Sequence, residues 1–271
     1  MGLPLAKAHA YGNDFLFVDA AIARATTHSE NLSEMARQLC NRHEGVGADG
    51  LILYELRPGG ATMQLFNADG SASELSGNGL RCLAALVTRV QGLAAGAQVV
   101  VYTDAGTKTL ELLRREGERY TYRAALGPPE DVRQISIPVD GESVTASILR
   151  LGNPQCVVLG PLPDHTRFSR LGPALATHPL FPAGTNVEFA HVEASDRVRI
   201  LIWERGVGPT SSSGTGASAS AVAAAAHGGA SRDVEVIAPG GTQHVEWRTD
   251  GVYLTGWADI LFNGDWLGSE L

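Results

Sequence analysis

An internal repeat constrains this chain more than any other feature of its sequence. Four landmarks recur in the same order in both halves: Gly12–Asp14 with Gly152–Pro154, Gly47–Asp49 with Gly184–Asn186, Asn67 with Glu204, and Ser76–Gly79 with Ser213–Gly216. The offset is 140 for the first pair (152 − 12) and 137 for the others (184 − 47, 204 − 67, 213 − 76). Glycine is abundant, at 32 of 271 residues, so single matches arise by chance. Four matches in order indicate two related halves of an old duplication.

Short runs rich in β-branched and apolar residues predict strands in both halves. They lie at Phe15–Val18, Leu51–Tyr54, Met63–Phe66, Val99–Tyr102 and Leu110–Leu113 in the first half, and at Cys156–Leu159, Val187–Ala190, Val198–Trp203, Val234–Ile237 and His244–Trp247 in the second. This order of strands, with further strands closing each half, indicates a mostly antiparallel sheet in each half.

A helix is expected after each Ser-Gly-x-Gly turn. The first should reach about Val90, with Gly92 as its stop signal, and the second about His227, with Gly228 as its stop. Small residues dominate both segments, which favours a helix closely surrounded by strands, although such residues are also good helix formers wherever they stand. The expected fold class is therefore α+β, with one central helix per half.

Charge and motif content exclude several function classes. The formal net charge is −8 and the pI about 5.5, which argues against a nucleic-acid partner because counterion release needs a surplus of Lys and Arg. No apolar run approaches the roughly 18 residues of a membrane span. Common zinc, calcium and nucleotide-binding motifs are absent. Three widely spaced cysteines (Cys40, Cys82 and Cys156) argue against a disulfide framework, so a cytoplasmic location is expected.

Ser76 and Ser213 each stand directly before a predicted helix. The simplest interpretation is that both are N-caps, because serine is a preferred residue at that position. The duplication suggests a second interpretation. Two helix N-termini related by pseudo-symmetry would present free backbone N–H groups to one ligand, which should then be anionic, and a carboxylate is the natural candidate.

Glu204 and Arg205 follow the apolar run Ile200–Trp203 and match Asn67 in the repeat. Together they could hold a zwitterion, with the guanidinium on a carboxylate and the carboxylate on an ammonium group. A solvated surface ion pair is the alternative.

These residues resemble the diaminopimelate epimerase family of cofactor-independent amino-acid racemases, which act in lysine and cell-wall biosynthesis. The motifs that carry the resemblance are His9-x-x-Gly-Asn-Asp-Phe15, Gly45-x-Gly-x-Asp-Gly50, Asn67-Ala-Asp-Gly-Ser71, Gly77-Asn-Gly-x-Arg-Cys82, Gly152-Asn-Pro154, Gly184-Thr-Asn-Val187, Glu204-Arg-Gly-x-Gly208, Gly214-Thr-Gly216 and Pro239-Gly-Gly241.

The resemblance implies two pseudo-symmetric domains, each a mostly antiparallel β-barrel around a central helix, with the active site in a cleft between them. The first domain would comprise residues 1–115 with a C-terminal strand at about 259–271, and the second residues 116–258. The implied substrate contacts are Asn13, Asn67, Gly77, Asn78, Asn153, Asn186, Glu204, Arg205, Gly214 and Thr215. The implied activity is that of an isomerase interconverting LL- and meso-diaminopimelate.

The catalytic residues of this family are two cysteines, one before each helix, and here Ser76 and Ser213 hold those positions. A thiol titrates at about 8.5, whereas a serine hydroxyl is a far weaker acid. Gln155 stands where the family has a histidine, and Pro209 where it has a glutamate. The expected catalytic residues are therefore Ser76, Ser213 and, as the remaining base, Glu204, with activity impaired or altered.

Three interpretations stay open: an epimerase whose two cysteines were exchanged for serine, a relative with another amino-acid substrate or a one-sided reaction, and a non-catalytic amino-acid binder. Outside the family, a structural or regulatory protein with two simple helix caps is the alternative. The resemblance implies no organic cofactor and no metal. It implies an amino acid as the small-molecule partner and no nucleic-acid or membrane partner, and a homodimer is among the assemblies that the sequence allows.

Overall fold

The computed structural model describes residues 2–26, 31–73 and 75–268, in two compact units. The N-terminal unit comprises Met1–Ala124 and Gly256–Leu271, and the C-terminal unit comprises Ala125–Thr255. The chain passes between them within strands β8 (Arg119–Gly127) and β17 (Gly251–Trp266). The last residues of the C-terminal strand expected at 259–271, residues 269–271, lie outside the described part of the chain.

Eight strands form a closed ring in the N-terminal unit: β1–β2–β3–β4–β6–β7–β8–β17, with β17 returning to β1. Besides β8 and β17, their bounds are Leu3–Ala10 (β1), Asn13–Asp19 (β2), Gly50–Arg57 (β3), Gly60–Asn67 (β4), Gln98–Thr103 (β6) and Gly106–Glu116 (β7), and the two-residue β5 (Ala72–Ser73) pairs with β4. Most pairs are antiparallel, as expected, but β2–β3 and β4–β6 are parallel.

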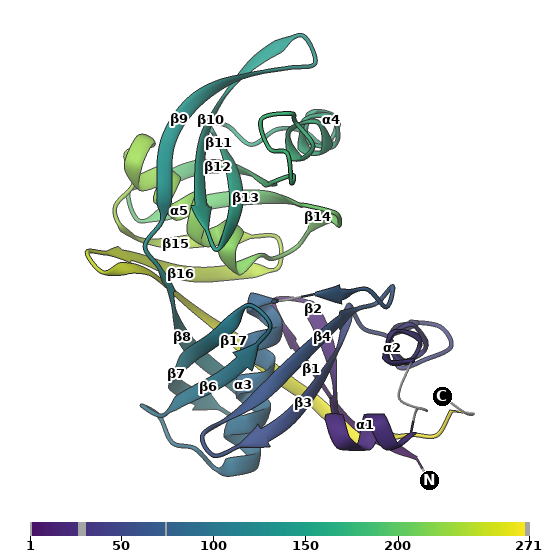
Figure 1. Cartoon of the computed structure of the whole chain (residues 1–271). Helices are drawn as coiled ribbons and strands as arrows, with labels where there is room; N and C mark the ends of the chain where they lie inside the picture. The colour runs from purple at the N-terminus through teal and green to yellow at the C-terminus, as the bar shows by residue number, and fades with distance from the viewer. Residues whose placement is uncertain (1, 27–30, 74, 269–271) are drawn as a thin grey trace. The chain divides into compact units, whose positions relative to one another are not determined.

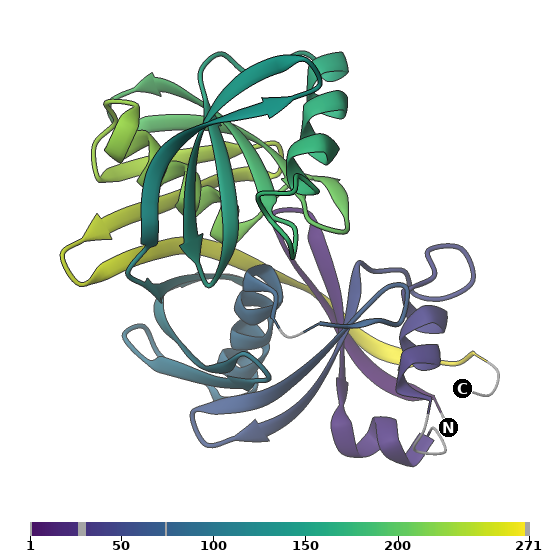
Figure 2. The same cartoon turned by 45° about the horizontal axis from the view of Figure 1, so that its top comes forward.

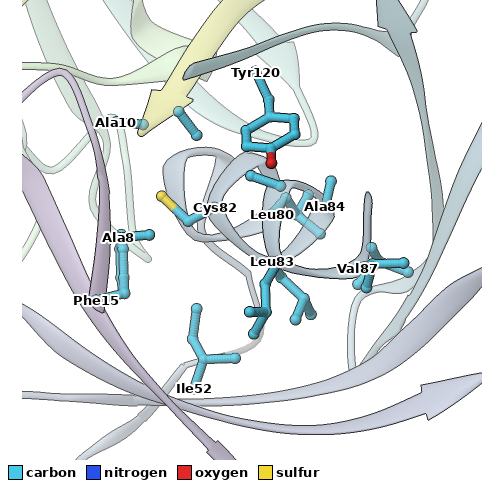
Figure 3. Close-up of a cluster of buried hydrophobic side chains, with 14 of the residues drawn as sticks. Ala8, Ala10, Phe15, Ile52, Leu80, Cys82, Leu83, Ala84, Val87 and Tyr120 are labelled. Atoms are coloured by element: carbon cyan, nitrogen blue, oxygen red, sulfur yellow. The ribbon is translucent and has the colours of Figure 1, made fainter. Parts of the chain in front are cut away.

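Helix α3 (Gly77–Gln91) lies inside this ring (Figure 1). Every residue from Asn78 to Thr88 is buried, because strands surround the helix on all sides. Figure 3 shows Phe15 and Ile52 among the side chains packed around α3. The helix ends at Gly92, whose φ of 64° is the left-handed conformation that glycine adopts without strain. Both the helix and its stop signal match the sequence-based expectation.

In the C-terminal unit, strands surround helix α5 (Gly214–His227) in the same way (Figures 1 and 2). These strands are β9 (Glu130–Val139), β10 (Glu142–Leu151), β11 (Asn153–Leu159), β12 (Asn186–Ala194), β13 (Arg197–Glu204), β15 (Asp233–Ala238) and β16 (Gly241–Arg248), while the short β14 (Gly208–Thr210) pairs with β13. Parallel pairing occurs at β11–β12 and β13–β15. The first three turns of α5 consist almost entirely of buried Gly, Ala and Ser, because the strands pass close to the helix axis.

Within the described residues, three further helices lie outside the strands that surround α3 and α5. They were not expected from the sequence. They are α1 (Ala20–Thr26) and α2 (Leu32–Cys40), which pack on β3, and α4 (His165–Ala176), which packs on β12 and β13. Helix α2 buries Met35, Ala36, Leu39 and Cys40 on one side, the spacing of an amphipathic helix. Helices α1 and α2 cover one apolar cluster of the N-terminal unit, and α4 covers another in the C-terminal unit.

The repeated landmarks have matching backbone conformations. Gly12 and Gly152 have φ angles of 86° and 78°, and Gly47 and Gly184 have φ angles of 79° and 73°. Ser76 and Ser213 have φ, ψ angles of −132°, 123° and −138°, 127°. The two halves therefore make the same turns at the same places in the repeat. Across the described ranges, no helix is long and apolar enough to cross a membrane.

Candidate active site

Ser76 is the N-cap of α3. Its side-chain oxygen accepts a hydrogen bond from the Gly79 backbone N–H at 3.1 Å, and its carbonyl accepts one from the Leu80 N–H at 2.8 Å. The simple capping role is thus fulfilled. The Ser76 hydroxyl can still donate its own proton, because the Gly79 bond uses only an acceptor position.

Ser213 caps α5 with the same geometry. Its Oγ accepts from the Gly216 N–H at 3.1 Å and lies 3.5 Å from the Thr215 hydroxyl. Ser213 is only 8% exposed, whereas Ser76 is half-buried. The structure therefore brings Ser213, Gly214 and Thr215 together as one turn with the first N–H groups of α5.

Asn13 and Asn78 meet beside the first turn of α3. The Asn78 amide donates to Asn13 Oδ1 at 3.2 Å, and the Asn13 amide donates to Asp49 Oδ2 at 2.7 Å. Arg81, which is fully buried, donates to Asn78 Oδ1. Two of the expected substrate contacts are thus held in place by one continuous set of hydrogen bonds.

A cluster of ion pairs fixes the start of β2. Asp14 is paired with Lys7 at 2.9 Å and with Arg42 at 2.7 Å, and Arg42 also pairs with Asp49 at 2.8 Å. Burial alone would raise the pKa of Asp14, but the two cations outweigh it and lower that pKa to about 2. Lys7 and Arg42 were not expected at the site, because nothing local in the sequence links them to Asp14.

Asn67 lies at the end of β4, and its side chain is engaged locally. Its amide donates to Ser71 Oγ at 2.9 Å, and its backbone N–H donates to the Ser71 carbonyl at 2.8 Å. Asn67 is exposed. These contacts are those of a turn residue.

The C-terminal unit contains three further expected substrate contacts, Asn153, Asn186 and Arg205. Gln155 donates to Asn153 Oδ1 at 2.5 Å, and the Arg205 backbone N–H donates to Asn186 Oδ1 at 2.9 Å. The Arg205 guanidinium donates to the Ala183 carbonyl at 2.8 Å and is otherwise exposed. It therefore has donors left for a carboxylate.

Glu204 is half-buried, while its neighbour Arg205 is exposed. Glu204 is the last residue of β13, whereas Arg205 begins the turn that follows, so the two side chains lie in different surroundings. Burial raises the pKa of the Glu204 carboxyl. A solvated surface ion pair does not describe this arrangement.

Glu188 is a further site residue that was not expected from the sequence. Its side chain is 0% exposed, and within the described residues neither carboxyl oxygen has a hydrogen-bond partner. A Cβ atom placed on Gly216 would lie 2.6 Å from Glu188 Oε1 and 3.2 Å from the Ser213 Cβ atom. Burial, with a contribution from Glu204, raises the pKa of Glu188 well above its usual value. The available signal was one carboxylate within the apolar run Val187–Ala190.

The three cysteines are buried and free, and none lies at the N-terminus of α3 or α5. Burial raises the pKa of the Cys82 and Cys156 thiols, so both stay protonated. Among the residues that the structure describes, no three His, Cys, Asp or Glu side chains are grouped as metal ligands would be.

The sequence matches known proteins over nearly its full length. The family described as Diaminopimelate epimerase matches residues 5–130 and 147–261. The diaminopimelate epimerase of Desulforudis audaxviator is 41% identical over 279 residues, covering 96% of this chain and 98% of that protein. The chloroplastic diaminopimelate epimerase of Oryza sativa is 35% identical, covering 97% of this chain and 79% of the rice protein.

Solved structures with the same fold are more distant in sequence. A hydroxyproline epimerase from Agrobacterium vitis has a TM-score of 0.68 and 17% identity, covering 97% of this chain and 91% of that one. A phenazine biosynthesis protein of the PhzF family from Bacillus anthracis has a TM-score of 0.69 and 14% identity, covering 99% of this chain and 100% of that one. At this identity the similarity concerns the fold alone.

Proposed function

This chain belongs to the diaminopimelate epimerase family, and we propose that it acts on the α-carbon of diaminopimelate without a cofactor. The observation that carries the proposal is the pair of identically capped turns at Ser76 and Ser213, in a chain that matches the family over both halves. Two helix caps would be enough for a purely structural role. Such a role would not require polar side chains such as Asn78 and Arg205 beside the caps.

In the proposed complex, the substrate carboxylate accepts hydrogen bonds from the first backbone N–H groups of a capped helix, such as those of α5 after Ser213. Helix N-termini stabilise such an anion, and also the negative charge that develops beside it when the α-proton leaves. Arg205 has free donors for a second carboxylate, and Glu204 an oxygen for an ammonium group.

Ser76 and Ser213 stand where the family resemblance puts the two proton-transfer groups. Each Oγ already accepts a backbone N–H, which favours negative charge on that oxygen. A serine hydroxyl nevertheless remains a much weaker acid than a thiol. Because general acid–base catalysis contributes roughly 10²–10⁴-fold, we propose that turnover is lower by at least that factor than with two cysteines.

The test is α-proton exchange of LL- and meso-diaminopimelate in D₂O, followed by proton NMR. The double variant Ser76→Cys/Ser213→Cys should exchange at least about 100-fold faster than the wild type. Ser231→Cys, on an exposed serine of the C-terminal unit, is the matched control and should leave the rate unchanged. Equal rates for all three proteins would contradict the assigned roles of Ser76 and Ser213.

A second candidate function is non-catalytic binding of an amino acid. The Gln155 amide donates a hydrogen bond to Asn153 and cannot act as a base. This observation favours a protein that binds an amino acid without catalysis. Diaminopimelate binding measured by calorimetry, without exchange in the wild type or in the double cysteine variant, would support the binder. Binding of a different amino acid in the same assay would instead point to another substrate.

A further inference from the structure

Glu188 lies on the face of β12 that is turned toward α5. The neighbouring positions on that face, Val157 on β11 and Ile202 on β13, pair with it directly and belong to the apolar cluster around α5. Glu188 Oε1 comes so close to Gly216 that a Cβ atom there would be only 2.6 Å away. The carboxyl is therefore packed under the first turn of α5, the turn that Ser213 caps.

The surroundings of Glu188 supply no counter-charge. Helix α5 has neither an acidic nor a basic residue in its first turn, β11 contributes only the Cys156 thiol, and β13 contributes a second carboxyl, Glu204. No cation forms an ion pair with Glu188 anywhere in the described ranges. An isolated, fully buried carboxylate is strongly disfavoured, and these surroundings therefore favour the protonated acid.

We propose that Glu188 holds a proton beneath the first turn of α5, and that the Ser213–Thr215 turn binds the substrate carboxylate only while that proton is present. This inference rests on the proposed function, because it concerns the same anion-binding turn. It assigns different charge states to two neighbouring carboxyls: Glu188 is neutral and Glu204 is ionised to meet an ammonium group.

Repulsion between two anions gives the direction and size of the effect. A substrate carboxylate at the N-terminus of α5 would lie one helical turn or less from an ionised Glu188. At such a separation, with an effective dielectric constant of about 20, the repulsion weakens binding by about a hundredfold or more. Affinity should therefore fall as the pH rises through the pKa of Glu188, and binding above that pKa should take up one proton.

The experiment is calorimetric titration of the full-length protein with meso-diaminopimelate from neutral pH upward to about pH 9, in buffers of different ionisation enthalpy. E188Q keeps the shape of the protonated acid but cannot ionise, so its affinity should stay level at the alkaline end of this range, where that of the wild type falls. E235Q, on the exposed face of β15, is the matched control and should behave as the wild type.

A second measurement does not depend on substrate. Infrared spectra of the wild type at neutral pH should contain the carbonyl band of a protonated carboxylic acid, and this band should be missing in E188Q and present in E235Q. If Glu188 is ionised at neutral pH, the inference is wrong, even if E188Q fails to fold. The same pH dependence of binding in wild type and E188Q would also overturn it. Proton-linked binding without α-proton exchange would contradict only the epimerase proposal, whereas no binding at all would contradict both.

Discussion

The first turns of α3 and α5 have the same cap but rest on different side chains. A Cβ atom on Gly79 would meet Ile52 Cδ1 at 3.0 Å and Met63 Cε at 3.3 Å, whereas one on Gly216 would meet the Glu188 carboxyl. Both glycines donate to the capping serine at 3.1 Å. The two halves thus share their backbone chemistry and differ in the polarity beneath it.

The strand register shows which sheet positions supply the side chains beneath the two capped turns. In the N-terminal unit, Phe15 pairs with Gly50 and Phe17 with Ile52 across the parallel β2–β3 pair. In the C-terminal unit, the β11–β12 pair aligns Gln155 with Asn186 and Val157 with Glu188. By this register, Ile52 and Glu188 hold equivalent positions, as do Phe15 and Gln155, although the offset between Ile52 and Glu188 (188 − 52 = 136) is one residue shorter than that of the repeated motifs. The N-terminal position is a hydrophobic support, and its C-terminal counterpart carries an ionisable group.

Exchanging the two supporting residues should give the largest effect. Ile52→Glu places a carboxyl without counter-charge in the apolar cluster around α3, and we expect a loss of about 3–5 kcal/mol of unfolding free energy. Glu188→Ile removes a carboxyl that has no hydrogen-bond partner among the described residues, and should change stability by less than about 1.5 kcal/mol. Urea unfolding of both variants measures the change in unfolding free energy. Equal losses would show that the two positions tolerate a carboxyl equally well.

The two glycines should also differ. Gly216→Ala drives its Cβ atom into a buried carboxyl, and overpacking of this kind costs about 1–3 kcal/mol. In Gly79→Ala, the flexible ends of Ile52 and Met63 can move, and the better helix propensity of alanine, worth up to about 1 kcal/mol, offsets the strain. The check is unfolding of each variant in urea, with Gly216→Ala/Glu188→Ala recovering most of the loss. A larger loss for Gly79→Ala would contradict the packing argument.

The pH dependence of stability should have opposite signs in the two units. The pKa of Glu188 is raised on folding, so its contribution is complete below the unfolded pKa of about 4.3 and is lost as the pH rises through the folded value, by up to about 1.4 kcal/mol per pH unit. The pKa of Asp14 is lowered to about 2, so its contribution is present above the unfolded pKa and lost as the pH falls toward 2. Unfolding free energies measured across pH should show that E188Q no longer loses stability as the pH rises, and that D14N no longer loses stability as the pH falls toward 2. If both variants keep the pH dependence of the wild type, the pKa shifts assigned to Glu188 and Asp14 are wrong.

The smallest effect should be the same in both halves. Ser76→Ala and Ser213→Ala each remove one capping hydrogen bond of the same length, 3.1 Å, so each should cost about 1 kcal/mol. Thermal or urea unfolding of the two single variants should agree within a few tenths of a kcal/mol. A clear difference would mean that the residues beneath the turns alter the caps themselves.

Much of the fold could be predicted from the sequence, but its outer helices could not. Helix α1 has only seven residues, and α4 contains Pro173 and Gly172 in its interior, which weakens a helical pattern. Gly172 is needed because a Cβ atom there would lie 2.6 Å from the Trp203 ring. The reason for that glycine is a contact with a distant strand, which local sequence does not encode.

Of the proposed site, the sequence located the two capped turns, the asparagines and the Glu204–Arg205 pair, because these depend on short spacings or on the repeat. It did not reveal the ion pairs of Asp14 with Lys7 and Arg42, or the protonation of Glu188. Those depend on partners brought together from separate strands and on the exclusion of water.

By itself, the sequence determined the duplication and the helix caps, since a cap joins a serine to an N–H group three residues later and needs no other part of the chain. Only the tertiary structure decided what lies beneath each cap. Gly216 and Glu188 meet because β12 passes under α5, and Glu188 keeps its proton because the surrounding strands remove it from water. A charge state of this kind is a property of the packed interior.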